Sequence, residues 1–382
     1  MLTKRNACFD RSLSTHRYAE ALLAEAGIRI NGERPWDIRL KAPGVIENAL
    51  SRGNLGLGES YVQGDWDAES LDQFFYRLMR ARLNRRVKPT QLMYHALRVR
   101  LLNRQSGKRA WQVGKAHYDL GNEFYAAMLD QRMTYTCGYW KRATTLDDAQ
   151  AAKLDLVCRK LALQPGMRLL DIGCGWGSFM AYAAEHYGVE CVGLTISREQ
   201  ADFGQRVMKR GLPVTFRLAD YRRETDTFDR VVSIGMFEHV GRKNHREFMR
   251  VANRCLKDDG LFLLHTIGKN VASTPPDPWM DKYIFPNGDV PSFNRIVAAA
   301  DSLFVMEDVH SFGADYDRTL MAWHANFCQH WLEFREQYGD TFYRMWRYYL
   351  LSCAGAFRAR ELQLWQLVLS KAGVVGGYSR VS

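Results

Sequence analysis

The sequence predicts an α/β protein with a doubly wound parallel sheet, preceded by a small mixed α/β domain. From about residue 151, apolar segments of strand length alternate with amphipathic segments of helical length, as in parallel sheets with helices on both faces. The run 169–179 places three alternate glycines between an apolar strand and a helix, where a sharp turn lets a ligand approach the backbone. With 382 residues, of which 47% are hydrophobic, the chain is long enough for one large and one smaller domain.

The smaller domain is expected to span residues 1–80. An amphipathic helix is predicted through 18–23 and an aromatic-rich helix through 71–76. Glycine and asparagine predict turns at 31–32 and at 54–58. No motif assigns a chemistry to this domain, and lipid binding is the hypothesis retained for it.

A basic segment follows, and residues 81–110 are predicted to link the two domains. Between Gln73 and Tyr118 there is no acidic residue, while twelve cations accumulate: Arg77, Arg80, Arg82, Arg85, Arg86, Lys88, Arg98, Arg100, Arg104, Lys108, Arg109 and Lys115. Interleaved apolar residues predict an amphipathic helix on an anionic membrane, and a solvated linker is the alternative. The net charge of +11 fits an anionic partner. Nucleic acid is disfavoured, because no helix-turn-helix or zinc-finger signature is present.

The larger domain is expected to occupy residues 111–382. Its predicted elements are a helix at 151–161, strand 168–172, a helix from 179, strand 190–194, helix 198–209, strand 214–218, strand 230–234, helix 246–256 and strand 261–266. Residues 269–317 are rich in proline and glycine, so we expect an irregular insertion that walls in a substrate like a lid. A long helical stretch is expected from Leu320.

The glycine-rich turn itself narrows the class of ligand. Gly173, Gly175 and Gly177 follow Asp171 with the spacing G-x-G-x-G, one residue shorter than the dinucleotide fingerprint G-x-G-x-x-G. The next strand runs into Thr195, where a nicotinamide site would need an acid for the ribose. A nicotinamide cofactor is therefore disfavoured.

Polar side chains lie at or just beyond the carboxyl ends of five predicted strands, at Asp171, Thr195, Asp220, Glu238 and His265. In a parallel sheet these ends meet at one edge, so we expect the five side chains to converge there. The Thr195 strand leads into a helix whose first turn offers Ser197 as a cap and the Gln200 amide as a ribose ligand. Glu238 follows an apolar strand, where a buried carboxylate is costly unless it binds something.

Cysteine usage and hydropathy favour a cytoplasmic protein. Eight cysteines fall at wide intervals with no C-x-x-C pair, which argues against a zinc site and a disulfide framework. Residues 1–9 lack the apolar core of a signal peptide, and no stretch approaches the roughly 20 apolar residues of a membrane span.

Six segments give the chain a more specific resemblance. They are HYDLGN (117–122), MTYTCGYW (133–140), GMFEHVG (235–241), FGADYD (312–317), GLGESY (56–61) and CAGAFRAR (353–360). Together with the glycine turn they resemble the cyclopropane-fatty-acyl-phospholipid synthases, in their bacterial two-domain form. These enzymes belong to the class I S-adenosylmethionine-dependent methyltransferases, so the resemblance implies the Rossmann-like sheet of that superfamily.

The resemblance implies transfer of a methylene group from S-adenosylmethionine to the cis double bond of an unsaturated phospholipid, through a carbocation that bound bicarbonate deprotonates. The matching catalytic residues are Cys137, Glu238, His265, Ile267 through its backbone, Tyr316 and Cys353, although a buried structural thiol is an equal alternative for Cys353. The matching cofactor residues are Tyr135 and Thr136 for the methionine part, Asp171, Gly173, Gly175 and Gly177 for the nucleoside, Thr195, Ser197 and Gln200 for the ribose side, and Asp220 and Tyr221 for the adenine. The mycolic-acid relatives have Gly-Trp-Glu where this chain has Asp220-Tyr221-Arg222, a departure that bears on the adenine contact.

The same resemblance implies a homodimer attached peripherally to the inner membrane. Two further hypotheses stay open. One is a methyltransferase that produces branched or methylated lipids without closing a ring, and the other is a non-catalytic binding protein that retains the fold.

Overall fold

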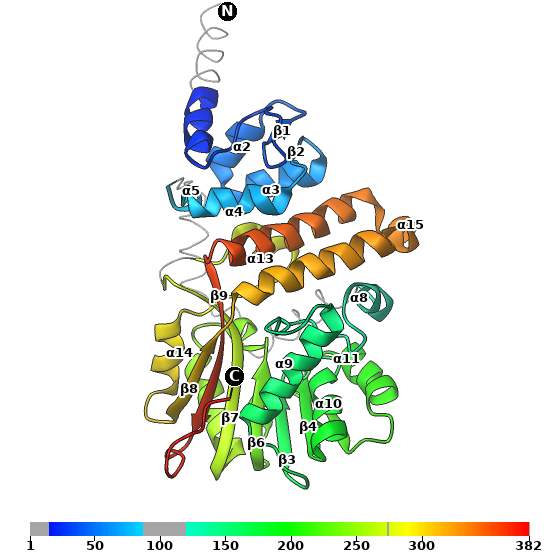
Figure 1. Cartoon of the computed structure of the whole chain (residues 1–382), viewed down its shortest axis with the longest axis vertical. Helices are drawn as coiled ribbons and strands as arrows, with labels where there is room; N and C mark the ends of the chain where they lie inside the picture. Colours follow the sequence, from blue (N-terminus) through cyan, green and yellow to red (C-terminus); the bar gives the residue numbers. More distant parts are fainter. Residues whose placement is uncertain (1–14, 87–119, 273–274, 382) are drawn as a thin grey trace, which may run out of the picture. The chain divides into compact units, whose positions relative to one another are not determined.

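The computed structural model describes residues 15–86, 120–272 and 275–381, and the chain forms two compact units (Figure 1). Unit 1 comprises residues 1–102, 275–284 and 320–361, and unit 2 comprises residues 103–274, 285–319 and 362–382. This division differs from the expected domains 1–80 and 111–382. Two later segments of the chain pack with the N-terminal residues, a long-range association that local sequence patterns do not encode.

Unit 2 contains a seven-stranded sheet in the order β5-β4-β3-β6-β7-β9-β8. The strands are β3 (Arg168–Ile172), β4 (Glu190–Thr195), β5 (Val214–Leu218), β6 (Phe228–Ile234), β7 (Leu256–Lys269), β8 (Val305–Ser311) and β9 (Leu362–Ser370). The first five strands of the sheet are parallel, and β9 runs antiparallel to both β7 and β8. The predicted α/β fold is confirmed, but β8 and β9 are additional strands that the sequence did not predict, and the antiparallel β9 makes the sheet mixed rather than wholly parallel.

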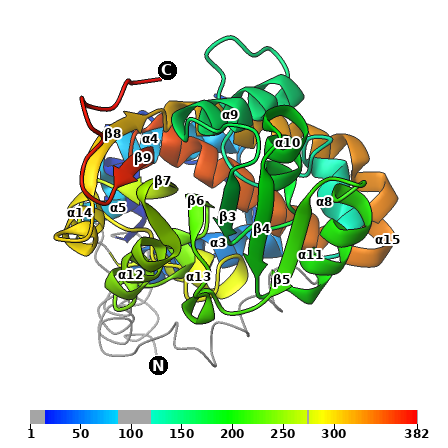
Figure 2. The same ribbon diagram turned by 90° about the horizontal axis from the view of Figure 1, so that it is seen from below.

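Helices cover both faces of this sheet, as Figure 2 shows for α9 and α10 on one side and α12 on the other. One core joins α9 (Leu146–Lys160) and α10 (Ser178–Tyr187) to alternate strand residues such as Leu169, and a second joins α12 (His245–Cys255) to the intervening ones such as Leu170. Successive side chains of a strand point to opposite faces, so a strand buried on both sides is apolar throughout.

The predicted strands at 168–172 and 214–218 agree with β3 and β5. The helix predicted at 198–209 is divided into α11 (Arg198–Phe203) and a π-helical turn at Gly204–Met208. The region 269–317 is not irregular, because it contains α13 (Pro278–Tyr283), α14 (Phe293–Ala300) and β8. Its prolines lie at the boundaries of elements, and Pro278 opens α13 at a position where its missing amide hydrogen costs nothing.

In unit 1 the turn predicted at 54–58 is wrong, because these residues lie within the helix α3 (Asn54–Gln63). A Cβ on Gly56 would lie 2.2 Å from the carbonyl oxygen of Asn48, which belongs to α2 (Val45–Arg52). A Cβ on Gly58 would lie 2.4 Å from Cδ1 of Trp279. These glycines therefore permit close packing of a helix rather than a turn.

The remaining elements of unit 1 are β1 (Arg39–Leu40), β2 (Trp66–Asp67), α4 (Leu71–Arg80), α5 (Leu83–Arg86) and a large part of α15. Helix α15 (Ala314–Arg358) starts six residues before the predicted helix and contains a non-helical residue, Gly339, which divides it into two arms.

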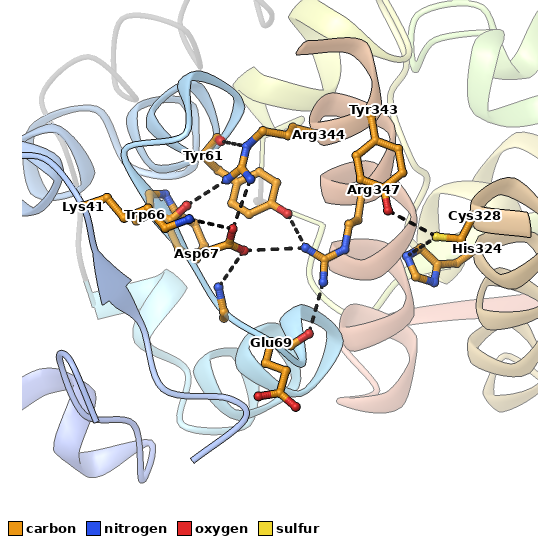
Figure 3. A network of polar contacts seen from close by, with 11 residues as sticks. Lys41, Tyr61, Trp66, Asp67, Glu69, His324, Cys328, Tyr343, Arg344 and Arg347 are labelled. Atoms are coloured by element: carbon orange, nitrogen blue, oxygen red, sulfur yellow. Dashed lines mark hydrogen bonds and ion pairs between the residues drawn. The ribbon is translucent and has the colours of Figure 1, made fainter. Parts of the chain in front are cut away.

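A hydrogen-bonded network ties the second arm of α15 to the N-terminal part of unit 1 (Figure 3). The Arg344 guanidinium donates to the carbonyl of Tyr61 at 2.6 Å, to the carbonyl of Trp66 at 2.9 Å and to Asp67 Oδ2 at 3.1 Å. Arg347 donates to the Tyr61 hydroxyl at 2.7 Å. These contacts give a physical reason why residues 320–361 belong to unit 1.

Most of the predicted basic segment, residues 87–115, lies outside the described residues, as do 117–119 of the HYDLGN motif. Within the described part, Arg77 stacks 3.8 Å above the Trp36 ring, while Arg85 and Arg86 form ion pairs with Glu361 and Glu25. Among the described residues, no helix is both long and apolar enough to cross a membrane, and no metal-binding cluster occurs.

Candidate active site

The glycine-rich turn follows β3 and leads into α10. Gly173, Gly175 and Gly177 have φ values of 87°, 54° and 87°, which residues with a side chain seldom adopt. A Cβ on Gly173 would lie 2.5 Å from Met236 Cγ, and one on Gly177 would lie 2.3 Å from Phe216 Cζ. A Cβ on Gly175 would meet no atom within 4 Å among the described residues. The outer glycines thus allow close packing, and the middle one leaves the backbone open to a ligand.

Asp171 is the fourth residue of β3 and lies just before this turn. Its side chain is buried, and Oδ1 has no hydrogen-bond partner among the described residues. Burial raises the pKa of its carboxyl group to about 7, although the charge of Lys153 opposes the shift. An unpaired buried oxygen is costly in a folded chain, so Asp171 is suited to accept a hydrogen bond from a ligand.

The predicted ribose-side residues form a local network at the end of β4. The Thr195 hydroxyl lies 3.1 Å from Gln200 Oε1 and accepts a hydrogen bond from the Ser197 amide at 3.1 Å. Ser197 also caps α11 by accepting from the Gln200 amide at 3.3 Å. The structure therefore brings these three residues together at the end of β4.

The residues predicted for the adenine lie after β5. Asp220 forms a bidentate ion pair with Arg222, at 2.9 and 2.8 Å. Tyr221 is buried against Phe248, with ring centroids 5.4 Å apart, and burial raises the pKa of its hydroxyl group. Because Arg222 occupies both carboxylate oxygens of Asp220, an adenine would have to share or replace that partner.

Glu238 follows the end of β6, whereas His265 lies inside the neighbouring strand β7, which continues to Lys269 beyond the end expected for it. Glu238 belongs to the 3-10 turn Phe237–His239 after β6, and its Oε1 accepts a hydrogen bond from the Ile267 amide at 2.5 Å. Its Oε2 is buried and has no partner among the described residues. Burial raises the pKa of this carboxyl group to about 7, while the Ile267 amide opposes the shift.

His265 is fully enclosed on β7, with Nδ1 3.2 Å from Nε2 of Gln366 on β9. An amide nitrogen is a donor only, so in this arrangement Nδ1 accepts and Nε2 carries the hydrogen of a neutral ring. Burial lowers the pKa of the imidazole well below its usual value, which keeps the ring neutral. Nε2 is buried without a partner among the described residues, so it is a donor suited to a ligand.

The segment before α9 contributes Tyr135, Thr136 and Cys137. The Cys137 thiol is buried and lies 3.2 Å from the Gly138 carbonyl and 3.9 Å from the Thr319 hydroxyl. Burial raises the pKa of this thiol well above its usual value, so it is a neutral donor. Tyr135 packs on Tyr125, with ring centroids 5.3 Å apart, and Thr136 is partly exposed.

The last two predicted catalytic residues belong to different units. Tyr316 lies in the first turn of α15, within unit 2, and is largely buried. Cys353 lies inside the second arm of α15, within unit 1. Burial raises the pKa of the Cys353 thiol to about 12, so it carries no thiolate near neutral pH.

Sequence reasoning missed several polar groups that organise this site. Gln366 sets the tautomer of His265, and Thr319 accepts from the Gly138 amide at 3.0 Å and from Trp140 Nε1 at 2.9 Å. On α9, Gln150 and Lys153 both hold the segment containing Thr136. One signal was available for these two, because they occupy the same face of α9 as Leu154 and Val157, where apolar residues are expected.

Comparison with known proteins identifies the family of this chain. The family model for mycolic acid cyclopropane synthetase matches residues 105–367. The chain belongs to this cyclopropane synthetase family. It is 52% identical over 368 residues to the cyclopropane-fatty-acyl-phospholipid synthase of Escherichia coli (strain K12), which corresponds to 95% of this chain and 94% of that protein.

Solved structures of cyclopropane synthetase relatives agree with the sheet described above. The cyclopropane synthase MmaA2 from Mycobacterium tuberculosis has 35% identity and a TM-score of 0.65, with 68% of this chain and 98% of that chain covered. The mycolic acid cyclopropane synthase CmaA1 complexed with SAH and CTAB also has 35% identity and a TM-score of 0.65, with 68% of this chain and 98% of that chain covered. The chain is therefore an enzyme with the class I methyltransferase fold, as its motifs predicted.

Proposed function

We propose that this enzyme transfers a methylene group from S-adenosylmethionine to the cis double bond of an unsaturated phospholipid acyl chain. One alkene carbon forms a bond to the sulfonium methyl carbon, the carbon–sulfur bond breaks, and loss of one proton accompanies closure of the cyclopropane ring. The name of the E. coli relative, which is similar over 95% of this chain, supports the lipid substrate. The SAH complex of the related CmaA1 supports the methyl donor.

The observation that carries this proposal is the pair of unpartnered buried atoms on Glu238, just after β6, and on His265 of β7, the residue paired with the last residue of β6. Glu238 Oε2 is an acceptor and His265 Nε2 is a donor, and neither has a hydrogen-bond partner among the described residues. Bicarbonate has one O–H donor and several acceptor oxygens, so its chemistry fits this combination. The neutral thiol of Cys137 and the hydroxyl of Tyr316 are the further donors that we assign to it.

Ile267 receives a more specific role than the sequence suggested. Its amide is engaged by Glu238 Oε1 at 2.5 Å, so we assign it to orienting the carboxylate. When bound, S-adenosylmethionine supplies the electrophilic methyl group, and bicarbonate supplies a base for the departing proton. The chain's own part is to orient these groups and to exclude water that would trap a carbocation.

We assign the cofactor to the edge formed by the turn after β3 and the ends of β4 and β5. Tyr135 and Thr136 take the methionine part, and Asp171 with Gly173, Gly175 and Gly177 takes the nucleoside. Thr195, Ser197 and Gln200 take the ribose side, and Asp220 and Tyr221 take the adenine. The open backbone at Gly175 and the unpaired Asp171 Oδ1 support this assignment.

We also propose that the enzyme works as a homodimer attached to the cytoplasmic face of the inner membrane. The net charge of +11 supports attraction to an anionic phospholipid surface. We further propose that the N-terminal domain takes part in lipid binding.

Incubation of the protein with vesicles of unsaturated phospholipid and S-adenosylmethionine tests the activity. Ring closure and simple methylation of the alkene both add one CH₂, so the mass of the lipid must be combined with mild catalytic hydrogenation of the product. A cyclopropane resists hydrogenation, whereas a methylated alkene takes up hydrogen. We expect a hydrogenation-resistant product whose formation falls when bicarbonate is removed from the buffer. A product that takes up hydrogen would instead identify a methyltransferase without ring closure.

A further inference from the structure

Lys153 is a buried cation within unit 2 that none of the roles above uses. It lies on α9 with its side chain fully enclosed, and its Nζ donates a hydrogen bond to Thr136 Oγ1 at 2.9 Å. No other hydrogen bond and no ion pair of its ammonium group is formed with the described residues. Burying an ammonium group without a direct counter-ion is costly, so its position calls for a functional explanation.

The charge of Lys153 reaches both halves of the proposed site. On the cofactor side it lowers the pKa of Asp171, and on the bicarbonate side it lowers the pKa of Cys137, in both cases against the larger effect of burial. It also lowers the pKa of His265, where it adds to the effect of burial. Asp130 is the other carboxylate whose charge acts on Lys153. The charge of Lys153 therefore acts on residues of both groups.

The contact with Thr136 has a directional consequence. The Thr136 carbonyl accepts a hydrogen bond from Gln150 Nε2 at 2.7 Å. The Thr136 methyl group packs closely on Gly235, because a Cβ on that glycine would lie only 2.6 Å from Thr136 Cγ2. Thr136 is therefore held from more than one side. Lys153 has only donors, so it occupies an acceptor position of Thr136 Oγ1. The hydroxyl hydrogen of the partly exposed Thr136 is thereby left to point at another acceptor.

We propose that Lys153 is a positioning residue, which holds the Thr136 hydroxyl as a donor to the carboxylate of the methionine part of S-adenosylmethionine. The cation behind the hydroxyl also strengthens that donor, because a hydrogen bond from a charged group polarises the next one in the chain. This inference rests on the proposed function, in which Thr136 faces the methionine part.

The test measures the dissociation constant of S-adenosylhomocysteine by titration calorimetry for the full-length protein and its variants. Lys153→Gln is expected to raise this constant about tenfold or more, with a matching rise in KM for S-adenosylmethionine. Lys153→Arg, which retains a charged donor, is expected to recover part of the affinity. In a double-mutant cycle, the variant that combines Lys153→Gln with Thr136→Val is expected to bind S-adenosylhomocysteine no more weakly than the weaker-binding single variant. Both substitutions remove the same contact.

Lys160 supplies a matched control from the same helix. It is equally buried, and its Nζ lies 3.0 Å from His310 Nδ1 and 3.8 Å from Asp308. Burial lowers the pKa of both lysines to about 8. Lys160→Gln therefore removes a comparable buried cation. We expect this variant to change the affinity for S-adenosylhomocysteine by no more than about twofold.

The outcomes separate this inference from the proposed function. If the unaltered protein fails to bind S-adenosylhomocysteine, the proposed function is wrong. If it binds and cyclopropanates lipid while Lys153→Gln binds equally well, the positioning role is overturned and the function stands. Should Lys153→Gln fail to fold, Thr136→Val decides, because affinity equal to that of the unaltered protein would exclude the Thr136 hydroxyl as the donor.

Discussion

The Ile267 amide hydrogen-bonds to Glu238 Oε1 across 2.5 Å and so fixes the carboxylate to β7 two residues beyond His265. Ile234 at the end of β6 is paired with His265, and the short turn after β6 returns Glu238 to its neighbouring strand. One backbone contact therefore sets an acceptor and a donor at the same edge of the sheet. The remaining oxygen of Glu238 is buried and unpaired among the described residues.

The first prediction concerns the chemistry of Glu238. Glu238→Gln retains the size of the side chain and an acceptor for Ile267, but replaces the unpaired oxygen with a donor. We expect kcat to fall by at least about 100-fold while the dissociation constant of S-adenosylhomocysteine changes by no more than about twofold. The exposed Glu190→Gln serves as a control, with activity retained. A complete loss of cofactor binding in Glu238→Gln would contradict the assigned role.

A second prediction follows from the pKa of the same group. Burial raises the pKa of Glu238 from its ordinary value of 4.5 to about 7. Between these values the folded protein binds more protons than the unfolded chain, so this group lowers the free energy of unfolding as the pH rises. Relative to the unaltered protein, Glu238→Gln should gain up to about 3 kcal/mol of stability between pH 4.5 and pH 7. Urea unfolding of both proteins at several pH values checks this, and a constant difference would refute it.

The third prediction separates backbone strain from ligand contact in the glycine turn. Gly175 and Gly211 both have positive φ, at 54° and 81°, and a Cβ on either meets no atom within 4 Å among the described residues. Alanine at either position should therefore lower the free energy of unfolding by a similar amount, about 1–2 kcal/mol. Only Gly175→Ala should weaken S-adenosylhomocysteine binding, by about tenfold. Equal affinities in the two variants would place the cofactor elsewhere.

The fourth prediction addresses Cys353, for which a catalytic and a structural role were both considered. Desolvation raises the pKa of its half-buried thiol to about 12, so it is not a nucleophile near neutral pH. We expect Cys353→Ala to retain kcat within about twofold and to lower the melting temperature slightly, because a small cavity is left. Cys137→Ala should lower kcat, because it removes a donor of the proposed bicarbonate site. Loss of turnover in Cys353→Ala with an unchanged melting temperature would restore the catalytic role.

The elements that the sequence predicted well are those whose pattern is local. Strands β3 and β5 are short and dominated by apolar or β-branched residues, and the glycines at 173, 175 and 177 follow the first of them directly. The strand-end positions of Asp171, Thr195 and Glu238 follow from this alternation, because carboxyl ends of parallel strands share one edge. His265 differs, because β7 continues beyond it to Lys269.

The failures have one physical cause, which is packing between residues distant in the sequence. Glycines at 56 and 58 indicate a turn by their backbone freedom, yet they form a helix because Asn48 and Trp279 approach them closely. Residues 362–370, for which no strand was predicted, form β9 by pairing with β7 and β8, which are distant in the sequence.

By itself the sequence determined the alternating α/β pattern, the glycine-rich turn and the family resemblance, since these depend on neighbouring residues. Only the tertiary structure decided that Gln366 sets the tautomer of His265, that Ile267 holds Glu238, and that Lys153 stands behind Thr136. Each of these contacts joins segments that the chain separates by at least 17 residues, so their chemistry exists only when the sheet and its helices have assembled.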